Sequence, residues 1–322
     1  MCVRTMVLTA LLSLCGVAGA IAQISLATGK PAGSQFLLAG KNSGATLYYD
    51  SRDFEVVKRA AGFLSQDIGL VTGRSATVRT LPAAHEATIV VIGTLGYNSL
   101  IDKLVSEGRL NLDKIRGGWE QYAVEVVERP AAGIRKALVI AGSDRRGTAY
   151  GVFSVSEAIG VSPWYWWADV PVAKKDRLTL DVKSYRSKEP SVKYRGLFIN
   201  DEDFGLKPWA AKTFEPEVGD IGPKTYSKIC ELLLRMKGNY LCPAMHSCTK
   251  AFNYYPDNKL VADSLAIVMG SVHCEPLLFN NASEWDRKTM GEWNYVTNKE
   301  GINKVLRKRV EENRSEEHTS EL

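Results

Sequence analysis

Three consecutive acidic residues follow an apolar run in the second half of the chain. The segment "YRGLFINDEDFGLKPW" carries Asp201, Glu202 and Asp203 directly after that run, with Asn200 before them. Neighbouring carboxylates repel one another, so such a cluster forms either a solvated turn or a site for a cation or a carbohydrate. Carboxylates also carry out the acid–base steps of glycosidic bond cleavage.

Two further apolar runs end in residues that could hold a ligand. "NYLCPAMH" ends in His246, and "IVMGSVHCEP" contains His273 and Glu275, followed by Asn281 and Trp285. Imidazole and amide groups hydrogen-bond hydroxyls, an imidazolium pairs with a uronate, and a flat indole stacks on a sugar ring. Together these residues predict a polar and aromatic cleft that suits a carbohydrate.

Each residue also has an ordinary structural explanation. One or two of the acids could cap a helix or lie in water, and a histidine at a strand end is commonly a packing residue. Asp201, His246, His273 and Glu275 could also bind a metal. Metal-dependent barrel hydrolases usually carry an H-x-H pair on the first strand, which "FINDED" lacks. We therefore predict no metal, and the convergence of these residues favours a ligand site.

A repeated strand–helix order must bring these residues together. Three apolar runs (194–200, 239–246, 267–276) alternate with three helical patterns (222–239, 258–266, 297–313). Three successive β/α units open a (β/α)8 barrel, in which catalytic groups lie at the carboxyl ends of the strands. A complete barrel needs about 250 residues, so residues 186–313 are predicted to form a partial TIM-barrel catalytic domain.

The last helical pattern carries the clearest boundary signal. Thr297 and Glu300 have the spacing of a capping box. The apolar positions that we expect to face inward are Ile302, Val305, Leu306 and Val310.

Residues 23–185 alternate strands and helices and predict an N-terminal α/β domain on a mixed sheet. "SDRRGTAYG" (143–151) lacks the glycine and lysine spacing of a phosphate loop and indicates a strand-to-helix turn. The aromatic residues of "SPWYWWADVPV" are expected in an interface core, with one or two as possible sugar platforms. The predicted fold class is α/β: this domain followed by the first three β/α units of a truncated (β/α)8 TIM barrel.

Both ends of the chain are expected to lie outside the fold. Residues 1–22 have one basic residue, a short apolar run and an A-x-A site, as in a signal peptide, which predicts export to the periplasm or the exterior. Residues 314–322, "RSEEHTSEL", resemble a translated sequencing adapter and are expected to be a non-native tail. The 322 residues carry a formal net charge of +5 with no basic patch typical of nucleic-acid binding, and no other segment could span a membrane.

Four cysteines lie beyond the signal peptide: Cys230, Cys242, Cys248 and Cys274. Their spacing is not that of a zinc site. Buried free thiols and a Cys242–Cys248 disulfide both remain open from the sequence.

Four long motifs resemble glycoside hydrolase family 115, the xylan α-1,2-glucuronidases: "GVSPWYWWADVPV", "YRGLFINDEDFGLKPWA", "LLLRMKGNYLCPAMH" and "IVMGSVHCEPLLFNNASEWD". The resemblance implies an exported bacterial enzyme that removes glucuronic acid or its 4-O-methyl ether from glucuronoxylan or related plant polysaccharides. It also implies inversion, no metal or cofactor, further domains after the barrel and a homodimer. Cys242 and Phe204 stand where the family usually has tryptophan.

The resemblance implies roles for the strand-end residues. Asp201 or its neighbour Glu202, together with Glu275, would belong to the catalytic wall. The residues expected to contact substrate are Asn200, Asp203, His246, His273, Asn281 and Trp285. Family carboxylates on later strands are absent, so the resemblance implies an inactive fragment; a non-catalytic carbohydrate-binding protein is the alternative. A uronate beside three acids also needs positive groups, and we expect an arginine outside the chain to supply part of that charge.

Overall fold

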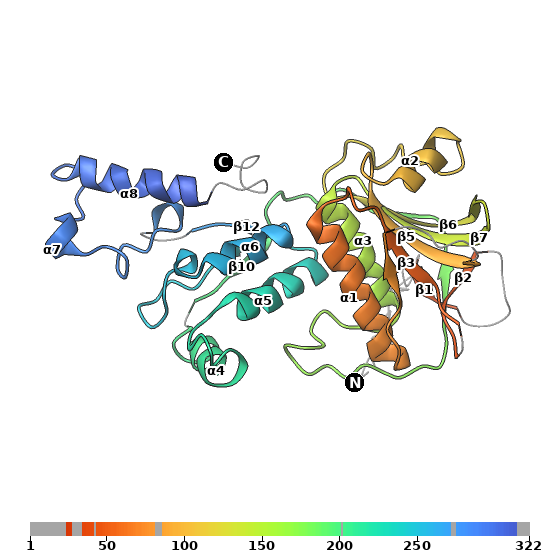
Figure 1. The fold of residues 1–322 in the computed structure, drawn as a ribbon, viewed down its shortest axis with the longest axis horizontal. Coiled ribbons are helices and arrows are strands. Elements are labelled where there is room, and N and C mark those ends of the chain that lie inside the picture. The colour runs from red at the N-terminus through yellow and green to blue at the C-terminus, as the bar shows by residue number, and fades with distance from the viewer. Residues whose placement is uncertain are drawn as a thin grey trace, which may run out of the picture.

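A computed structural model of the chain describes residues 24–27, 34–41, 43–80, 86–200, 202–271 and 275–313. The predicted signal peptide, the predicted tail at 314–322 and two candidate site residues, Asp201 and His273, lie outside these ranges. Figure 1 shows two parts side by side, an N-terminal part with a large sheet and a C-terminal part with a small one.

The N-terminal part is built on a six-stranded mixed sheet with the order β4-β3-β5-β7-β6-β9. The strands from β4 to β7 run parallel, and β6 and β9 continue the sheet antiparallel. The bounds are β3 (Thr46–Tyr49), β4 (Val78–Arg79), β5 (Thr88–Thr94), β6 (Tyr122–Ala131), β7 (Ile134–Gly142) and β9 (Tyr185–Arg186). A second, antiparallel sheet contains β1 (Ile24–Leu26), β8 (Leu178–Val182) and β2 (Gln35–Ala39). The predicted mixed sheet is therefore confirmed.

Helices cover both faces of the large sheet. In β5, Val90 and Ile92 face the core under α1 (Glu55–Thr72) and α3 (Arg145–Ala158), whereas Ile89 and Val91 face α2 (Ser99–Ser106). Successive side chains of a strand point to opposite faces, so an uninterrupted apolar run is required where both faces are buried. Figure 1 shows α1 and α3 lying together across one face.

The segment 143–151 is a strand-to-helix turn, as predicted. Asp144 caps α3 by accepting a hydrogen bond from the backbone N–H of Gly147. A Cβ atom at Gly147 would lie 2.2 Å from the carbonyl oxygen of Gln121. The glycine is thus required for close packing of the chain, and no phosphate loop is present at this turn.

The C-terminal part contains three parallel strands in the order β10 (Gly196–Phe198), β11 (Tyr240–Cys242) and β12 (Val268–Met269). The helices that follow them are α5 (Pro223–Arg235), α6 (Pro256–Ser264) and α8 (Lys299–Glu312). Short elements fill the connections: α4 (Leu206–Trp209), η1 (Ala210–Phe214), η2 (Phe252–Tyr254), η3 (Pro276–Leu278) and α7 (Arg287–Met290). The β/α order is as expected, and closure into an eight-stranded barrel stays a prediction.

Two details expected of α8 are wrong. Its N-cap is Asn298, and no side chain caps the helix there, so the Thr297–Glu300 capping box does not form. Val310 is 42% exposed, whereas the neighbouring Arg309 is buried. The guanidinium of Arg309 donates to the carbonyl of Leu278 at 2.6 Å, and this bond turns the arginine side of the helix inward.

The two parts share one continuous core. Apolar residues of α1 and α3 belong to the same buried cluster as Ile229 and Leu233 of α5. At the same interface the guanidinium of Arg235 binds both carboxylate oxygens of Asp67, each at 2.9 Å, and both residues are buried. This contact fixes α5, and with it the first β/α unit, against the N-terminal part.

The aromatic run after α3 packs mainly into this interface. Trp166 and Trp167 contact each other and Trp209, and Trp166 contacts Phe214. The indole N–H of Trp167 donates to the carbonyl of Lys228 in α5. The interface interpretation is confirmed for these two tryptophans.

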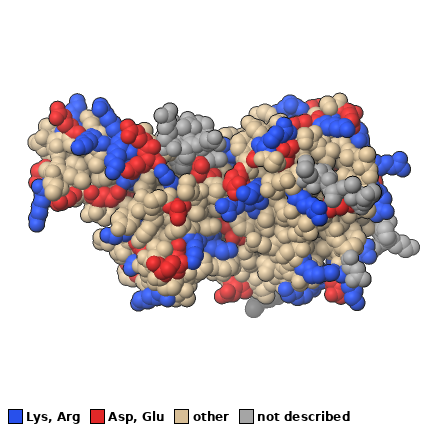
Figure 2. Space-filling model, viewed as in Figure 1, with Lys and Arg blue, Asp and Glu red and all other residues tan. Residues whose placement is uncertain are grey.

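Three cysteines, Cys230, Cys242 and Cys248, are free thiols, so the alternative Cys242–Cys248 disulfide is not formed. Within the described ranges no helix is both long and apolar enough to cross a bilayer. Among those residues no group of three or more acidic, histidine or cysteine side chains is placed to hold a metal ion. Figure 2 shows basic and acidic side chains interspersed over the visible face.

Candidate functional site

The loop after β10 is tied to the loop after β11 by Glu202. Its carboxylate Oε1 accepts hydrogen bonds from the backbone N–H groups of Met245 and His246, both at 2.7 Å. Glu202 is 1% exposed. Its Oε2 has no hydrogen-bond partner in the described structure and lies 3.7 Å from Nδ1 of His246. Glu202 therefore positions the second strand end, and one of its oxygens still faces the imidazole.

His246 bridges two acids of the first strand end. Its Nδ1 contacts Oδ2 of Asp203 at 2.5 Å, and Oε2 of Glu202 lies 3.7 Å from the same nitrogen. The pKa of Asp203 is lowered by hydrogen bonds from the Cys248 thiol, which has the larger effect, and from His246. Burial first, and then Asp203, raise the pKa of the Cys248 thiol to about 12. Cys248 is thus a protonated hydrogen-bond donor, and it is not suited to nucleophilic attack.

Glu275 lies after β12 and is 8% exposed. Burial is the main cause that raises its pKa to about 7, and repulsion from Glu284 and Glu202 adds to it, whereas His246 acts in the opposite direction. Glu275 is therefore close enough to interact electrostatically with both other strand ends. A carboxyl group that holds its proton near neutral pH is suited to general acid catalysis.

The backbone beside Glu275 is strained. Leu277 and Leu278 have φ values of 56° and 60°, in the left-handed region that non-glycine residues rarely adopt. Each such residue costs about 1–2 kcal/mol. Strain of this kind persists only where the surroundings enforce it, and it is common next to functional groups.

The loop that follows Glu275 is held by Asn280. Its side-chain Nδ2 donates to the carbonyl of Met245 at 2.7 Å, and its Oδ1 accepts from the backbone N–H groups of Ala282 and Ser283. The adjacent Asn281 is half-buried, and its side chain makes no hydrogen bond to a described residue. The second and third strand ends are therefore joined directly, and Asn281 is left available to a ligand.

Trp285 occupies a different environment from the one expected of a substrate contact. It is buried beside Phe279 and Trp293, and its indole N–H donates to the carbonyl of Gly291 at 2.9 Å. The ring and its N–H group are thus used in packing the small core under α8.

Glu284 and Arg309 form an ion pair close to the strand ends that we did not predict. Glu284 is the charged group with the largest influence on the pKa of Glu275. No sequence signal indicates this pair, since Arg309 lies between apolar positions of a helix whose outer face is basic. Arg309 is bound to this acid, so the expected arginine that would offset a substrate uronate from outside the chain stays a prediction.

The remaining candidate residues border the cluster. Asn200 is exposed after β10, and Phe204, beside the acids, is 87% exposed. Asp201 and His273 lie outside the described residues. The structure brings Glu202, Asp203, His246 and Glu275 together, as their strand-end positions predicted.

Residues 187–322 match the family model described as glycosyl hydrolase family 115. A solved structure described as a family GH115 4-O-methyl-α-glucuronidase with specificity for decorated arabinogalactans is 36% identical, with a TM-score of 0.73 over 86% of this chain. The match covers 35% of that protein, so this chain spans about a third of its relative. None of the curated proteins matches the chain.

More distant solved structures are also similar. CpGH84D is 12% identical with a TM-score of 0.48, over 90% of this chain and 41% of its own. An N-acetyl-β-hexosaminidase of Streptomyces plicatus is 11% identical with a TM-score of 0.45, over 80% of this chain and 46% of its own. The family match includes all three strand ends, and the first solved relative extends the similarity across most of the chain. The chain therefore belongs to glycosyl hydrolase family 115.

Proposed function

We propose that this chain is part of a glycoside hydrolase that removes α-1,2-linked glucuronic acid, or its 4-O-methyl ether, from decorated plant polysaccharide. The observation that carries the proposal is the convergence of Glu202, His246 and Glu275 at the carboxyl ends of three adjacent parallel strands. Family membership and the α-glucuronidase relative support the reaction class. Export to the periplasm or the exterior, where such polymers are found, is part of the proposal.

In this proposal Glu275 donates the proton to the leaving-group oxygen. Its raised pKa keeps a large fraction protonated near pH 7. Asp203 orients His246, and the imidazole, when protonated, pairs with the uronate of the substrate. Glu202 holds the loop that carries His246.

Inversion also needs a base that activates water, with its carboxyl roughly 6.5–9.5 Å from that of the acid. Asp203 is bound to His246. Glu202 is buried, with Oε1 on two backbone N–H groups and Oε2 facing the imidazole, so we assign neither residue the role of base. Asp201 and the part of the relative that this chain does not span are the remaining sources. Of these two, we propose that the base comes from the part of the relative that this chain does not span, and that the 322 residues alone therefore release no uronic acid.

The test is a release assay with glucuronoxylan and with arabinogalactan. We expect no uronic acid from the 322-residue chain and release by a chain extended to the length of the solved relative. Glu275→Gln in the extended chain should lower kcat by at least about 100-fold, the usual contribution of a general acid. Proton NMR of the first product identifies its anomer and hence tests inversion.

Two results would contradict parts of the proposal. Release by the 322-residue chain would refute its inactivity. An extended chain that binds the polymer without releasing uronic acid would favour the non-catalytic carbohydrate-binding alternative.

A further inference from the structure

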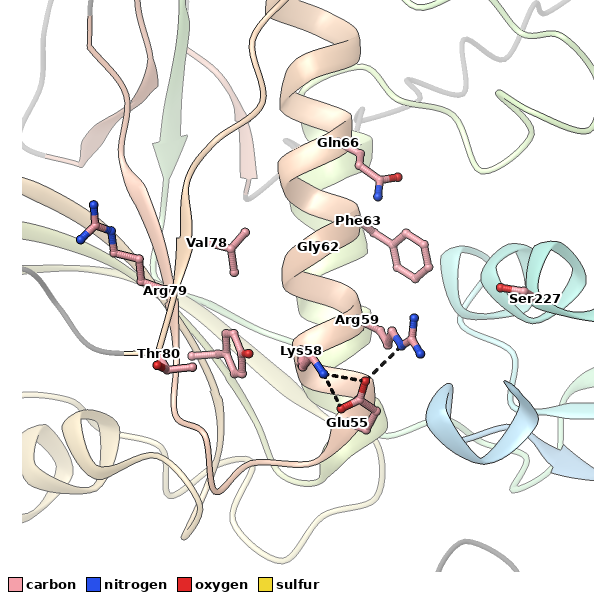
Figure 3. A pocket seen from close by; sticks show the side chains of 11 residues that line it. Glu55, Lys58, Arg59, Gly62, Phe63, Gln66, Val78, Arg79, Thr80 and Ser227 are labelled. Carbon is pink, nitrogen blue, oxygen red and sulfur yellow. Dashed lines mark hydrogen bonds and ion pairs between the residues drawn. The ribbon is translucent and has the colours of Figure 1, made fainter. Parts of the chain in front are cut away.

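A surface hollow of about 870 Å³ lies over α1, and none of the strand-end residues lines it. Figure 3 shows Gly62 on the face of α1 turned to the viewer, with Val78 and Thr80 on one side and Ser227 of α5 on the other. The volume lies within the 300–1,000 Å³ range of small-molecule sites. The hollow thus joins the edge of the N-terminal sheet to the first helix of the C-terminal part.

The glycine at the floor has no packing explanation. Gly62 lies in the middle of α1, where glycine costs about 1 kcal/mol relative to alanine. A Cβ atom at Gly62 would meet nothing within 4 Å. Gly69 of the same helix is a useful contrast, because a Cβ there would lie 2.6 Å from Oγ of Ser75. Gly62 keeps the floor flat and open, at the expense of helix stability.

Positive charge predominates around the hollow. Lys58, Arg59 and Arg79 line it, together with a single acid, Glu55. Glu55 contacts Lys58 at 3.1 Å and Nε of Arg59 at 3.2 Å, and all three side chains are well exposed. One carboxylate therefore faces two accessible cations, whereas Nε of Arg79, on the strand side of the hollow, lies 4.0 Å from a carboxylate oxygen of Glu86. An anionic ligand would gain charge-assisted hydrogen bonds here.

An aromatic ring lies next to these cations. Figure 3 shows Phe63, Arg59 and Gln66 projecting from α1 toward the side of Ser227. The Phe63 ring is held by Phe153, with ring centroids 5.9 Å apart. An apolar ring beside a guanidinium, an amide and a hydroxyl matches a sugar ring that bears a carboxylate. Phosphate alone would leave the aromatic wall unused.

We propose that this hollow is a second, non-catalytic binding site for a uronic-acid-bearing segment of a polysaccharide. The preference for an anionic sugar rests on the lining residues alone. The choice of a plant polysaccharide that carries glucuronic acid side groups rests on the proposed function. A site on α1 would hold the polymer while the strand-end cluster acts on a side chain.

The test places a large side chain, that of Gly62→Trp, at the floor of the hollow. The probes are glucuronic-acid-bearing xylo-oligosaccharides and the same oligosaccharides with the carboxyl group reduced to an alcohol, titrated calorimetrically into the full chain. We expect Gly62→Trp to weaken binding of the acidic probe at least about tenfold, which corresponds to the loss of a single good contact. Gly62→Ala, the matched control, should bind the acidic probe as the unchanged chain does. The unchanged chain should bind the reduced probe at least about tenfold more weakly than the acidic one.

Two outcomes overturn the inference: equal binding by Gly62→Trp and Gly62→Ala, or equal binding of the acidic and reduced probes. Loss of binding in His246→Ala but not in Gly62→Trp would place the sugar at the strand ends; it would refute the second site and leave the proposed function standing. If Gly62→Trp fails to fold, Arg59→Ala serves instead, with Lys41→Ala as a control cation that does not line the hollow.

Discussion

The Glu275 side chain links burial to chemistry at the residue scale. Its pKa is raised to about 7 from an ordinary value of 4.5, because the carboxylate form is poorly solvated and lies near Glu284 and Glu202. Between these two pH values the folded protein holds a proton that the unfolded chain has released. The contribution of Glu275 to stability is therefore fully present below pH 4.5 and is lost as the pH rises to 7.

Glu275→Gln should remove this pH dependence, because an amide does not ionise. Relative to the unchanged chain, the variant should gain up to about 3 kcal/mol in free energy of unfolding between pH 4.5 and pH 8. Urea unfolding at the two pH values measures the difference. Glu311→Gln, on the exposed face of α8, is the control; an equal change in both variants would rule out a special environment for Glu275.

At the scale of single elements, α1 combines two glycines with opposite demands. Gly62 faces open space, and Gly69 is in close contact with the turn that follows the helix. The helix ends at Gly73 in the left-handed conformation, as glycine favours. Glycine thus leaves the hollow open at position 62 and allows close packing against Ser75 at position 69.

Alanine at these two positions should separate the roles. Gly62→Ala should raise the free energy of unfolding by about 0.5–1 kcal/mol, because the helix gains propensity and no atom is displaced. Gly69→Ala should give no such gain, since its Cβ would press on the backbone nitrogen of Ser75 at 3.2 Å. Thermal unfolding of the two variants provides the comparison; equal stabilisation would contradict the packing role of Gly69.

For the whole molecule, the interface between the two parts resembles the interior of one domain. The shared apolar core and the buried Arg235–Asp67 pair leave little freedom for relative motion. Glu231 also binds Arg235, so the guanidinium is surrounded by acceptors and by the rings of Phe153 and Tyr165.

Breaking this pair should destabilise the chain strongly. Asp67→Ala leaves Arg235 buried with one partner fewer and should cost about 3–5 kcal/mol. Asp67→Leu combined with Arg235→Met should recover part of that loss, because the buried guanidinium is removed with its partner and Glu231 keeps Lys228 and Tyr165 as partners. Chemical denaturation followed by fluorescence measures both. A cost below about 1 kcal/mol for Asp67→Ala would mean that the pair is solvated.

The sequence predicted the convergence of the site because three strands in consecutive parallel order must present their carboxyl ends on one edge. The sequence could not show that one carboxylate oxygen of Glu202 accepts hydrogen bonds from the backbone N–H groups of Met245 and His246. That contact depends on how the loops after β10 and β11 pack together. Val310 was expected to face inward and is exposed, whereas Arg309 is buried. Apolar periodicity does not reveal the carbonyl of Leu278, to which the Arg309 guanidinium donates. Trp285 was read as a sugar contact, and its neighbours Phe279 and Trp293 bury it.

The continuous core between α1, α3 and α5 predicts that the two parts are inherited together. A gene fragment that began after Arg186 would encode α5 with an apolar face and the Arg235 charge both turned to water. Such a piece could not be transferred to another carrier domain by simple recombination. The N-terminal part is therefore expected to remain joined to strands β10, β11 and β12 through gene rearrangements, whether or not it contacts substrate.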